Sequence, residues 1–267
     1  INRQALTAAN AVGQGWISSG SVLFVGPHGV GKTHLLEGIA QAAREGNQSY
    51  KAILFSAEDF LQKFLSNLRS NSTGQWRRWV RSHTLFLLDD LHRLAGKRST
   101  QEELLHHLDH LHREGGVFVT SMTDWGKCRN GLIPELADRL ASGVHSRLSI
   151  PDALSKGAIF QQSLDSMDRI LTAPEVVDWI GNNLFGSARE IQGAAQTLWL
   201  AAKTRSIPID LPLAREVLGH LTQTAYSPKT CVAQISGSLS GQKIHHCQCH
   251  RNRRIPGREE PQHHFGW

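Results

Sequence analysis

Short apolar runs recur through the first 150 residues and alternate with longer segments of helical spacing. The runs occupy residues 21–26, 51–56, 84–90, 116–122 and 145–150. Consecutive apolar positions are typical of strands buried on both faces, and strands that alternate with helices form parallel sheets. One intervening segment places four leucines on a single helical stripe, namely Leu104, Leu105, Leu108 and Leu111. The pattern predicts an α/β domain over residues 1–150, with a parallel five-stranded sheet flanked by helices.

The strand pattern stops at Pro151, and the segments that follow have helical spacing only. We expect helices at residues 153–168, 174–184, 187–204 and 210–222, with Ser187 as the N-cap of the third. They predict a small all-helical second domain over residues 151–225. Residues 226–267 are polar, rich in Gly, Pro and His, and without amphipathic period. We therefore expect a disordered or degenerate basic tail there.

Composition and charge are those of a soluble globular protein. Of the 267 residues, 40% are hydrophobic and 19% are charged, and no apolar run approaches the ~18 residues of a membrane span. No signal peptide is visible at the start, so we expect a cytoplasmic protein. The formal net charge is +6, and residues 226–267 contribute most of it, with six basic and two acidic side chains. This balance permits an anionic partner such as DNA without requiring one.

One glycine-rich segment carries the clearest chemistry. The sequence GPHGVGKT fits the pattern G-x-x-x-x-G-K-[ST] and lies between a predicted strand and a predicted helix. In such a loop the backbone N–H groups surround phosphate oxygens, the lysine adds positive charge and the final hydroxyl binds Mg²⁺. The sequence predicts an ATP site that contains Gly26, Pro27, His28, Gly29, Val30, Gly31, Lys32, Thr33 and His34.

Two carboxylates follow the third predicted strand. Asp89 and Asp90 end the run TLFLLDD, one strand–helix unit after the glycine-rich loop. We expect both to be catalytic residues: Asp89 holds Mg²⁺ together with Thr33, and Asp90 orients or activates the attacking water.

These motifs belong to a longer pattern that resembles a known family. The segments GPHGVGKTHLLEGI, LFLLDDLHRLAGKRSTQEEL, LADRL and SAREIQGA resemble, in this order, the AAA+ module of the DnaA family of bacterial chromosomal replication initiators. The resemblance covers about residues 2–222. It implies a P-loop AAA+ fold with a helical lid, and an ATP-dependent switch that self-associates through AAA+ modules on DNA in replication initiation. It also implies the replicative helicase or other replication proteins as further partners.

The resemblance assigns roles to individual residues. Arg189 matches the lid arginine that senses the γ-phosphate, so it joins the expected cofactor site. Lys97 matches a basic residue that faces single-stranded DNA, and Arg98 adjoins it, so both are expected DNA contacts. Arg139 lies in the matching ADRL motif.

One departure from the family pattern concerns hydrolysis. Gly143 stands where the family has an arginine that reaches the ATP of a neighbouring subunit. Arg147 lies four residues later, so its spacing from the ADRL motif differs from that of the family's arginine, which it would have to replace from this position. We therefore expect a weak ATPase at most, and the sequence leaves open whether ATP is hydrolysed.

Two further departures leave the biological role open. Met122 stands where the sensor strand of the family has an acid. Thr120, Ser121 or Asp124 takes the place of this acid only if the register of the strand changes. After Tyr226 the sequence shows no pattern typical of a helix-turn-helix domain. The alternatives are therefore an initiator paralogue or helicase-loader-type regulator that binds other replication proteins without recognising duplex DNA, or a degenerate, non-hydrolysing relative.

The segment WRRWVR, residues 76–81, has two interpretations. Interleaved aromatic and basic residues are typical of surfaces on which nucleic-acid bases stack. The same pattern also fits an amphipathic helix with its tryptophans in the core and its arginines outside.

Overall fold

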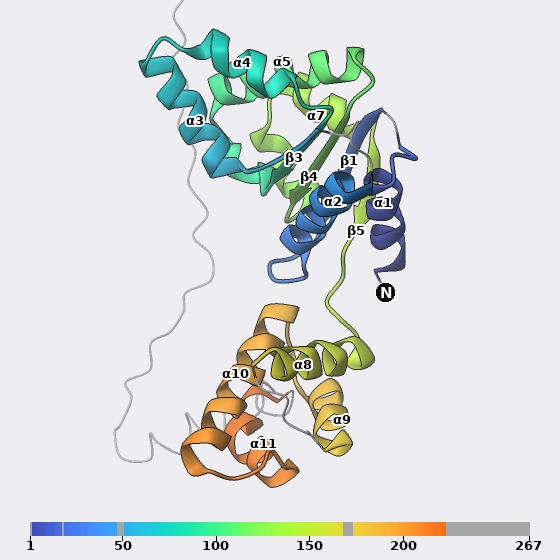
Figure 1. The fold of residues 1–267 in the computed structure, drawn as a ribbon, viewed down its shortest axis with the longest axis vertical. Helices are drawn as coiled ribbons and strands as arrows, with labels where there is room; N and C mark the ends of the chain where they lie inside the picture. The colour runs from blue at the N-terminus through green and yellow to red at the C-terminus, as the bar shows by residue number, and fades with distance from the viewer. Residues whose placement is uncertain (1, 18, 47–50, 168–172, 223–267) are drawn as a thin grey trace, which may run out of the picture. The chain divides into compact units, whose positions relative to one another are not determined.

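The computed structural model describes residues 2–17, 19–46, 51–167 and 173–222 (Figure 1). Strands and helices alternate up to residue 147. The strands are β1 Gly20–Val25, β2 Ala52–Ser56, β3 Leu85–Asp89, β4 Val117–Met122 and β5 Val144–Arg147. The helices of this region are α1 Arg3–Gly13, α2 Lys32–Gly46, α3 Ala57–Arg69, α4 Thr73–Arg81, η1 Leu91–Leu94, α5 Arg98–Arg113, α6 Trp125–Cys128, η2 Arg129–Gly131 and α7 Pro134–Ala141, where η denotes a 3₁₀ helix.

The five strands form one parallel sheet in the order β2-β3-β4-β1-β5. The register places Ser56 of β2 beside Asp89 of β3, and Leu88 of β3 beside Thr120 of β4. The carboxyl ends of these strands therefore meet at one edge of the sheet. Ligands of open α/β sheets bind outside this edge.

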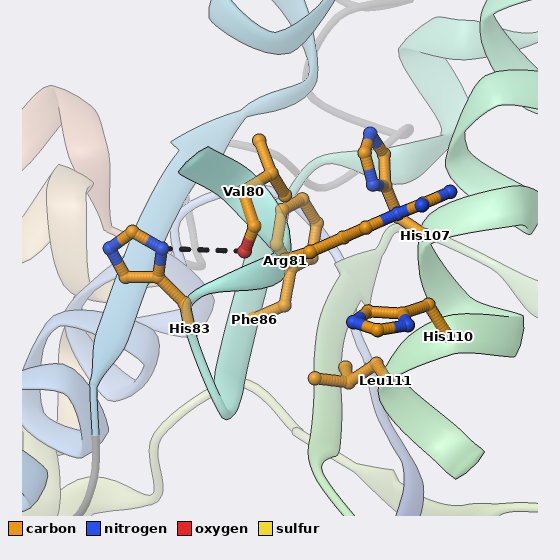
Figure 2. A pocket seen from close by; sticks show the side chains of 7 residues that line it. All are labelled: Val80, Arg81, His83, Phe86, His107, His110 and Leu111. Carbon is orange, nitrogen blue, oxygen red and sulfur yellow. Dashed lines mark hydrogen bonds between the residues drawn. The ribbon is translucent and has the colours of Figure 1, made fainter. Parts of the chain in front are cut away.

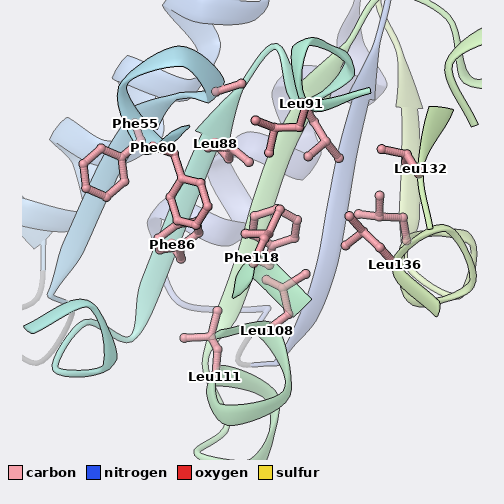
Figure 3. Packing of buried hydrophobic residues seen from close by; sticks show 14 of the residues in the cluster. Phe55, Phe60, Phe86, Leu88, Leu91, Leu108, Leu111, Phe118, Leu132 and Leu136 are labelled. Atoms are coloured by element: carbon pink, nitrogen blue, oxygen red, sulfur yellow. The ribbon is translucent and has the colours of Figure 1, made fainter. Parts of the chain in front are cut away.

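Helices cover both faces of the sheet because its strands are apolar on both sides. In β3, Phe86 and Leu88 belong to a core that also contains residues of α3, α4, α5 and α7. Figure 3 shows Phe86 and Leu88 among other side chains of this core, such as Phe60 and Phe118. Leu85 and Leu87 of the same strand point to the opposite core, beneath α1 and α2. All four side chains are at most 2% exposed. The alternation of side chains along a strand thus supplies two cores from one continuous apolar run.

The residues after β5 are helical. They form α8 Ala153–Met167, α9 Pro174–Asn183, α10 Ala188–Arg205 and α11 Leu211–Leu218, followed by η3 Gly219–Leu221. A separate apolar cluster joins these helices, with Phe160, Ile180 and Leu198 fully buried. Ser187 is the N-cap of α10, as predicted, and its backbone N–H donates to the Glu190 carboxylate at 2.6 Å in a capping box.

The segment WRRWVR forms most of α4 and combines features of both interpretations. Trp76 is buried between α3 and α5, as the amphipathic helix predicts. Trp79 is 48% exposed, with its ring centroid 6.2 Å from that of Phe55. The helix therefore buries one tryptophan and leaves the other half accessible.

The predicted fold class is confirmed, since the structure has the parallel five-stranded sheet with flanking helices that the apolar runs indicate. The last predicted helix differs: α11 ends at Leu218, and the 3₁₀ turn η3 continues the chain. The predicted tail, residues 226–267, lies outside the described residues. Within the described ranges no helix is long and apolar enough to cross a membrane.

Candidate nucleotide-binding site

The glycine-rich loop connects β1 to α2 at the carboxyl edge of the sheet. Gly29 and Gly31 have φ angles of +77° and +98°, a left-handed backbone that glycine adopts readily. These turns allow α2 to begin at Lys32, directly after the loop. The first N–H groups of a helix have no partner inside the helix and attract anions, so the loop has the local geometry of a phosphate site.

Lys32 lies across this loop. The residue is only 6% exposed, and its Nζ donates to the carbonyl oxygens of Gly26 at 2.8 Å and Pro27 at 2.9 Å. Burial lowers the pKa of Lys32, and the nearby carboxylates of Asp90 and Asp89 offset this effect only in part. Both hydrogen-bond acceptors of the ammonium are neutral, so a phosphate would supply a counter-charge that the carbonyls do not.

Asp89 connects three elements of the site. The Thr33 hydroxyl of α2 donates to Asp89 Oδ2 at 2.6 Å, and the Ser121 hydroxyl of β4 donates to Asp89 Oδ1. Hydroxyl and carboxylate oxygens are hard ligands of the kind that Mg²⁺ prefers. Thr33 and Asp89 therefore fit the predicted metal site, although Ser121 was not among the predicted site residues.

The sensor strand differs from the expectation. Met122 is fully buried in the core that faces α5. Ser121 reaches Asp89 without any change of register, since β3 and β4 pair continuously. Thr120 bonds to the backbone of β3 instead, and exposed Asp124 caps α6. Compensation by a neighbouring polar residue thus needs no shift of the strand, because the residue before Met122 already points at the carboxylate.

Asp90 turns the chain out of β3 into η1. Its backbone is left-handed, with φ 55° and ψ 45°, and its N–H donates to Ser121 Oγ at 2.9 Å. The Asp90 carboxylate lies 3.5 Å from Arg93 Nε, and Arg93 Nη1 donates to Glu58 Oε1 at 2.5 Å. The second predicted carboxylate therefore lies in the site but is paired with an arginine.

A single large pocket brings most of the predicted residues together. Of these residues it is lined by His28, Gly29, Val30, Gly31, Lys32, Thr33, His34, Asp89, Asp90 and Arg189. Gly26 and Pro27 belong to the loop but do not line the pocket. The pocket wall also contains Asn2, Glu58 and Arg93, which were not predicted to belong to the site.

His92 and Asn2 also support the site. The His92 ring centroid lies 6.1 Å from that of His28, and its buried Nδ1 has no hydrogen-bond partner among the described residues. Burial lowers the pKa of His92, which favours the neutral imidazole.

Asn2 Oδ1 accepts from the Ser149 N–H at 2.9 Å, and Asn2 Nδ2 donates to the Ser149 carbonyl at 3.3 Å. This pair fixes the start of α1 beside the segment that follows β5.

Lys97 and Arg98 lie outside this pocket. Lys97 precedes α5 and is exposed, and Arg98 begins the helix with a side chain that is 82% exposed. Arg98 Nε donates to Glu102 Oε1 at 2.8 Å. Both residues are accessible to a polyanion, and their role as DNA contacts stays a prediction.

Gly143 lies against the backbone of β1. A Cβ atom at this position would lie 2.3 Å from the Ser21 carbonyl oxygen, so any larger residue must displace the strand or the turn. Arg147 is exposed on β5, at the edge of the sheet, and Arg139 pairs with Asp109. The turn therefore excludes an arginine at position 143 by its shape.

A second cavity lies between α4 and α5 and is much smaller (Figure 2). It is lined by Val80, Arg81, His83, Phe86, His107, His110 and Leu111. Its volume of about 10 Å³ is at the limit for one water molecule, so it does not accommodate a ligand. In the described part of the chain, no group of three or more His, Cys, Asp or Glu side chains is arranged to hold a metal ion.

Comparisons with known proteins agree with this geometry. The family model of the bacterial DnaA ATPase domain matches residues 1–150. The chromosomal replication initiator protein DnaA of Helicobacter acinonychis is 33% identical over 200 residues, which cover 75% of this chain and 44% of that protein. This chain thus spans less than half the length of that relative.

Solved structures show the same fold. Domain III of the Thermotoga maritima replication initiation protein DnaA has a TM-score of 0.75 at 24% identity, covering 83% of this chain and 92% of that one. The replication initiator DnaA bound to AMPPCP and single-stranded DNA has a TM-score of 0.66 at 26% identity, covering 77% of this chain and 64% of that one. From the matched family model and the identity to its relatives, the chain belongs to the bacterial DnaA family.

Proposed function

We propose that this chain is the nucleotide-dependent switch of a replication initiator, which binds ATP with Mg²⁺ and, in that form, self-associates and contacts DNA. The observation that carries the proposal is the meeting of Lys32, Thr33 and Asp89 at one edge of the sheet in a chain of the DnaA family. A relative at 26% identity was solved with the ATP analogue AMPPCP and single-stranded DNA, which supports both ligands.

The two parts of the chain have different tasks in this proposal. Residues 1–150 form the nucleotide-binding domain, and residues 151–225 form a lid whose Arg189 responds to the γ-phosphate. Lys97 and Arg98 contact DNA from the start of α5. The protein acts in the cytoplasm, where the chromosome lies.

The side chains of the site suit this task. Lys32 exchanges the carbonyls of Gly26 and Pro27 for phosphate oxygens. Thr33 and Asp89 hold the metal ion, which when bound offsets the phosphate charge. Asp90 orients a water molecule beside the terminal phosphate.

Hydrolysis is slow in this proposal, for two reasons that concern charge. The turn at Gly143 has no space for an arginine that acts on a neighbouring subunit's nucleotide. The Asp90 carboxylate is also paired with Arg93, so the guanidinium competes with a water molecule for the same oxygen atoms. ATP binding, rather than its turnover, is then the event that switches the protein.

A nucleotide titration with two lysine variants tests the proposal. We expect Lys32→Ala to weaken binding of a fluorescent ATP analogue at least tenfold, because it removes a charge-assisted contact to phosphate. Lys63→Ala is the matched control, since Lys63 is exposed on α3 and does not line the pocket. Equal affinities for Lys32→Ala and wild type, with both variants melting at the wild-type temperature, would refute ATP binding at this loop.

A further inference from the structure

Arg93 is a cation of the nucleotide pocket that the family resemblance does not assign. It lies in η1, the 3₁₀ turn that follows β3, and its side chain is 48% exposed. It lines the same pocket as Lys32, Thr33 and Asp89. Its guanidinium lies between two carboxylates, Glu58 Oε1 at 2.5 Å and Asp90 Oδ2 at 3.5 Å.

The position of Arg93 within the pocket indicates which part of a nucleotide it meets. Asp90 directly follows Asp89, and both bond to Ser121, through the Asp90 N–H and the Asp89 carboxylate. Arg93 is therefore at the metal end of the site. The pocket lining also includes apolar residues of α1, among them Leu6 and Ala9, which suit the base rather than the phosphates.

The partners of Arg93 leave it able to change contacts. Glu58 is 68% exposed, and an ion pair between exposed side chains contributes little because water competes for both charges. A guanidinium binds phosphate oxygens in a two-pronged, planar arrangement, and a terminal phosphate carries more negative charge than one carboxylate. Exchange of Glu58 for phosphate is thus favourable.

We propose that Arg93 binds the terminal phosphate of ATP within its own subunit and gives the site its preference for ATP over ADP. The proposal rests on nucleotide binding at the glycine-rich loop. Arg93 acts on nucleotide affinity from within its own subunit and does not replace the arginine that the turn at Gly143 excludes. Glu58 holds the guanidinium in place when no terminal phosphate is present.

The test compares ATP and ADP affinities of the full chain by isothermal titration calorimetry with Mg²⁺. We expect Arg93→Gln to weaken ATP binding about tenfold and to leave ADP binding unchanged, so the preference for ATP falls about tenfold. Glu58→Gln frees the guanidinium and strengthens ATP binding by a few fold. Arg93→Lys keeps part of the preference because it keeps the charge.

Arg205→Gln is the matched control. Arg205 is 46% exposed and pairs with Glu216 at 2.8 Å on the α10–α11 side of the chain, so it resembles Arg93 in exposure and partner but does not line the pocket. We expect wild-type affinities for both nucleotides in this variant.

The outcomes separate the two proposals. If Lys32→Ala and wild type bind ATP equally, nucleotide binding at the loop is wrong. If ATP binding depends on Lys32 but Arg93→Gln keeps the wild-type ratio of ADP to ATP dissociation constants, the role of Arg93 is wrong and nucleotide binding stands. Equal weakening of ATP and ADP by Arg93→Gln also overturns the role, because it indicates a general effect on the pocket.

Discussion

Substitution of Arg77 by glutamine removes the charge partner of a buried carboxylate. Glu103 of α5 is 3% exposed, and Arg77 of α4 donates to it twice, at 2.8 Å from Nε and 2.5 Å from Nη2. His107 Nε2 lies 3.2 Å from the same carboxylate. Burial alone raises the pKa of Glu103, but the contacts with His107 and Arg77 outweigh burial and lower the pKa to about 2.

The expected loss follows from this pKa. The fall from 4.5 to about 2 corresponds to about 3 kcal/mol, shared between His107 and Arg77. Water replaces part of the contact because Arg77 is 43% exposed. We therefore expect Arg77→Gln to lower the free energy of unfolding by about 2 kcal/mol at pH 7, since it leaves Glu103 buried without its arginine.

The dependence on pH has a definite sign. The folded pKa of Glu103 lies below the unfolded one, so its stabilisation is complete above pH 4.5 and is lost as the pH falls toward 2. The difference between wild type and Arg77→Gln must shrink in this window. Glutamine at both Arg77 and Glu103 completes a double-mutant cycle that isolates the pair.

Urea denaturation at pH 7 and pH 3 measures these quantities. Arg205→Gln serves again as the control, because it breaks an ion pair whose side chains are both exposed and should therefore lower the free energy of unfolding much less than Arg77→Gln. The reasoning fails if Arg77→Gln destabilises no more than Arg205→Gln, or if its effect at pH 3 is as large as at pH 7.

Three further predictions concern the turn at Gly143, the metal site and DNA. Gly143→Ala should lower the free energy of unfolding, measured in urea, by about 2 kcal/mol. Gly193→Ala, in the open interior of α10, should raise it by about 0.5 kcal/mol, and equal effects of the two substitutions would contradict the close approach of Gly143 to β1. Asp89→Asn should abolish the increase in ATP affinity that Mg²⁺ produces, measured against EDTA, and a wild-type increase would remove Asp89 from the metal site. Lys97→Ala should weaken single-stranded DNA binding in fluorescence anisotropy and reduce the slope of log affinity against log salt concentration by about 0.7. Lys63→Ala should leave both at wild-type values, and identical slopes for Lys97→Ala and wild type would exclude a phosphate contact at Lys97.

The fold was predictable because its signals are local. Strands β1 to β4 each contain a short, mainly apolar run, whereas β5 (VHSR) does not, and the two cores need both faces of β3 to be apolar. The glycine-rich loop was predictable for the same reason, since its residues are consecutive and its strand and helix adjoin it. The approach of Asp89 to Thr33 across 56 residues followed from the parallel arrangement of the strands.

The rest of the site depends on contacts that sequence spacing does not encode. Ser121 was expected to compensate for Met122 only with a change of register, and the pairing of β3 with β4 shows instead that Ser121 faces the Asp89 carboxylate without one. The pairing of Arg93 with Glu58 joins residues 35 positions apart through exposed side chains, which carry no periodic signal. Steric exclusion at Gly143 depends on the Ser21 carbonyl, which belongs to another element.

The contact between Gly143 and β1 also bears on how the chain can evolve. One base change in a glycine codon is enough to encode arginine, so the substitution itself arises easily. Its product would collide with the carbonyl of a central strand before it conferred any benefit. An arginine at position 143 therefore requires an earlier change that opens the turn, and substitutions at other positions around the nucleotide meet no such obstacle.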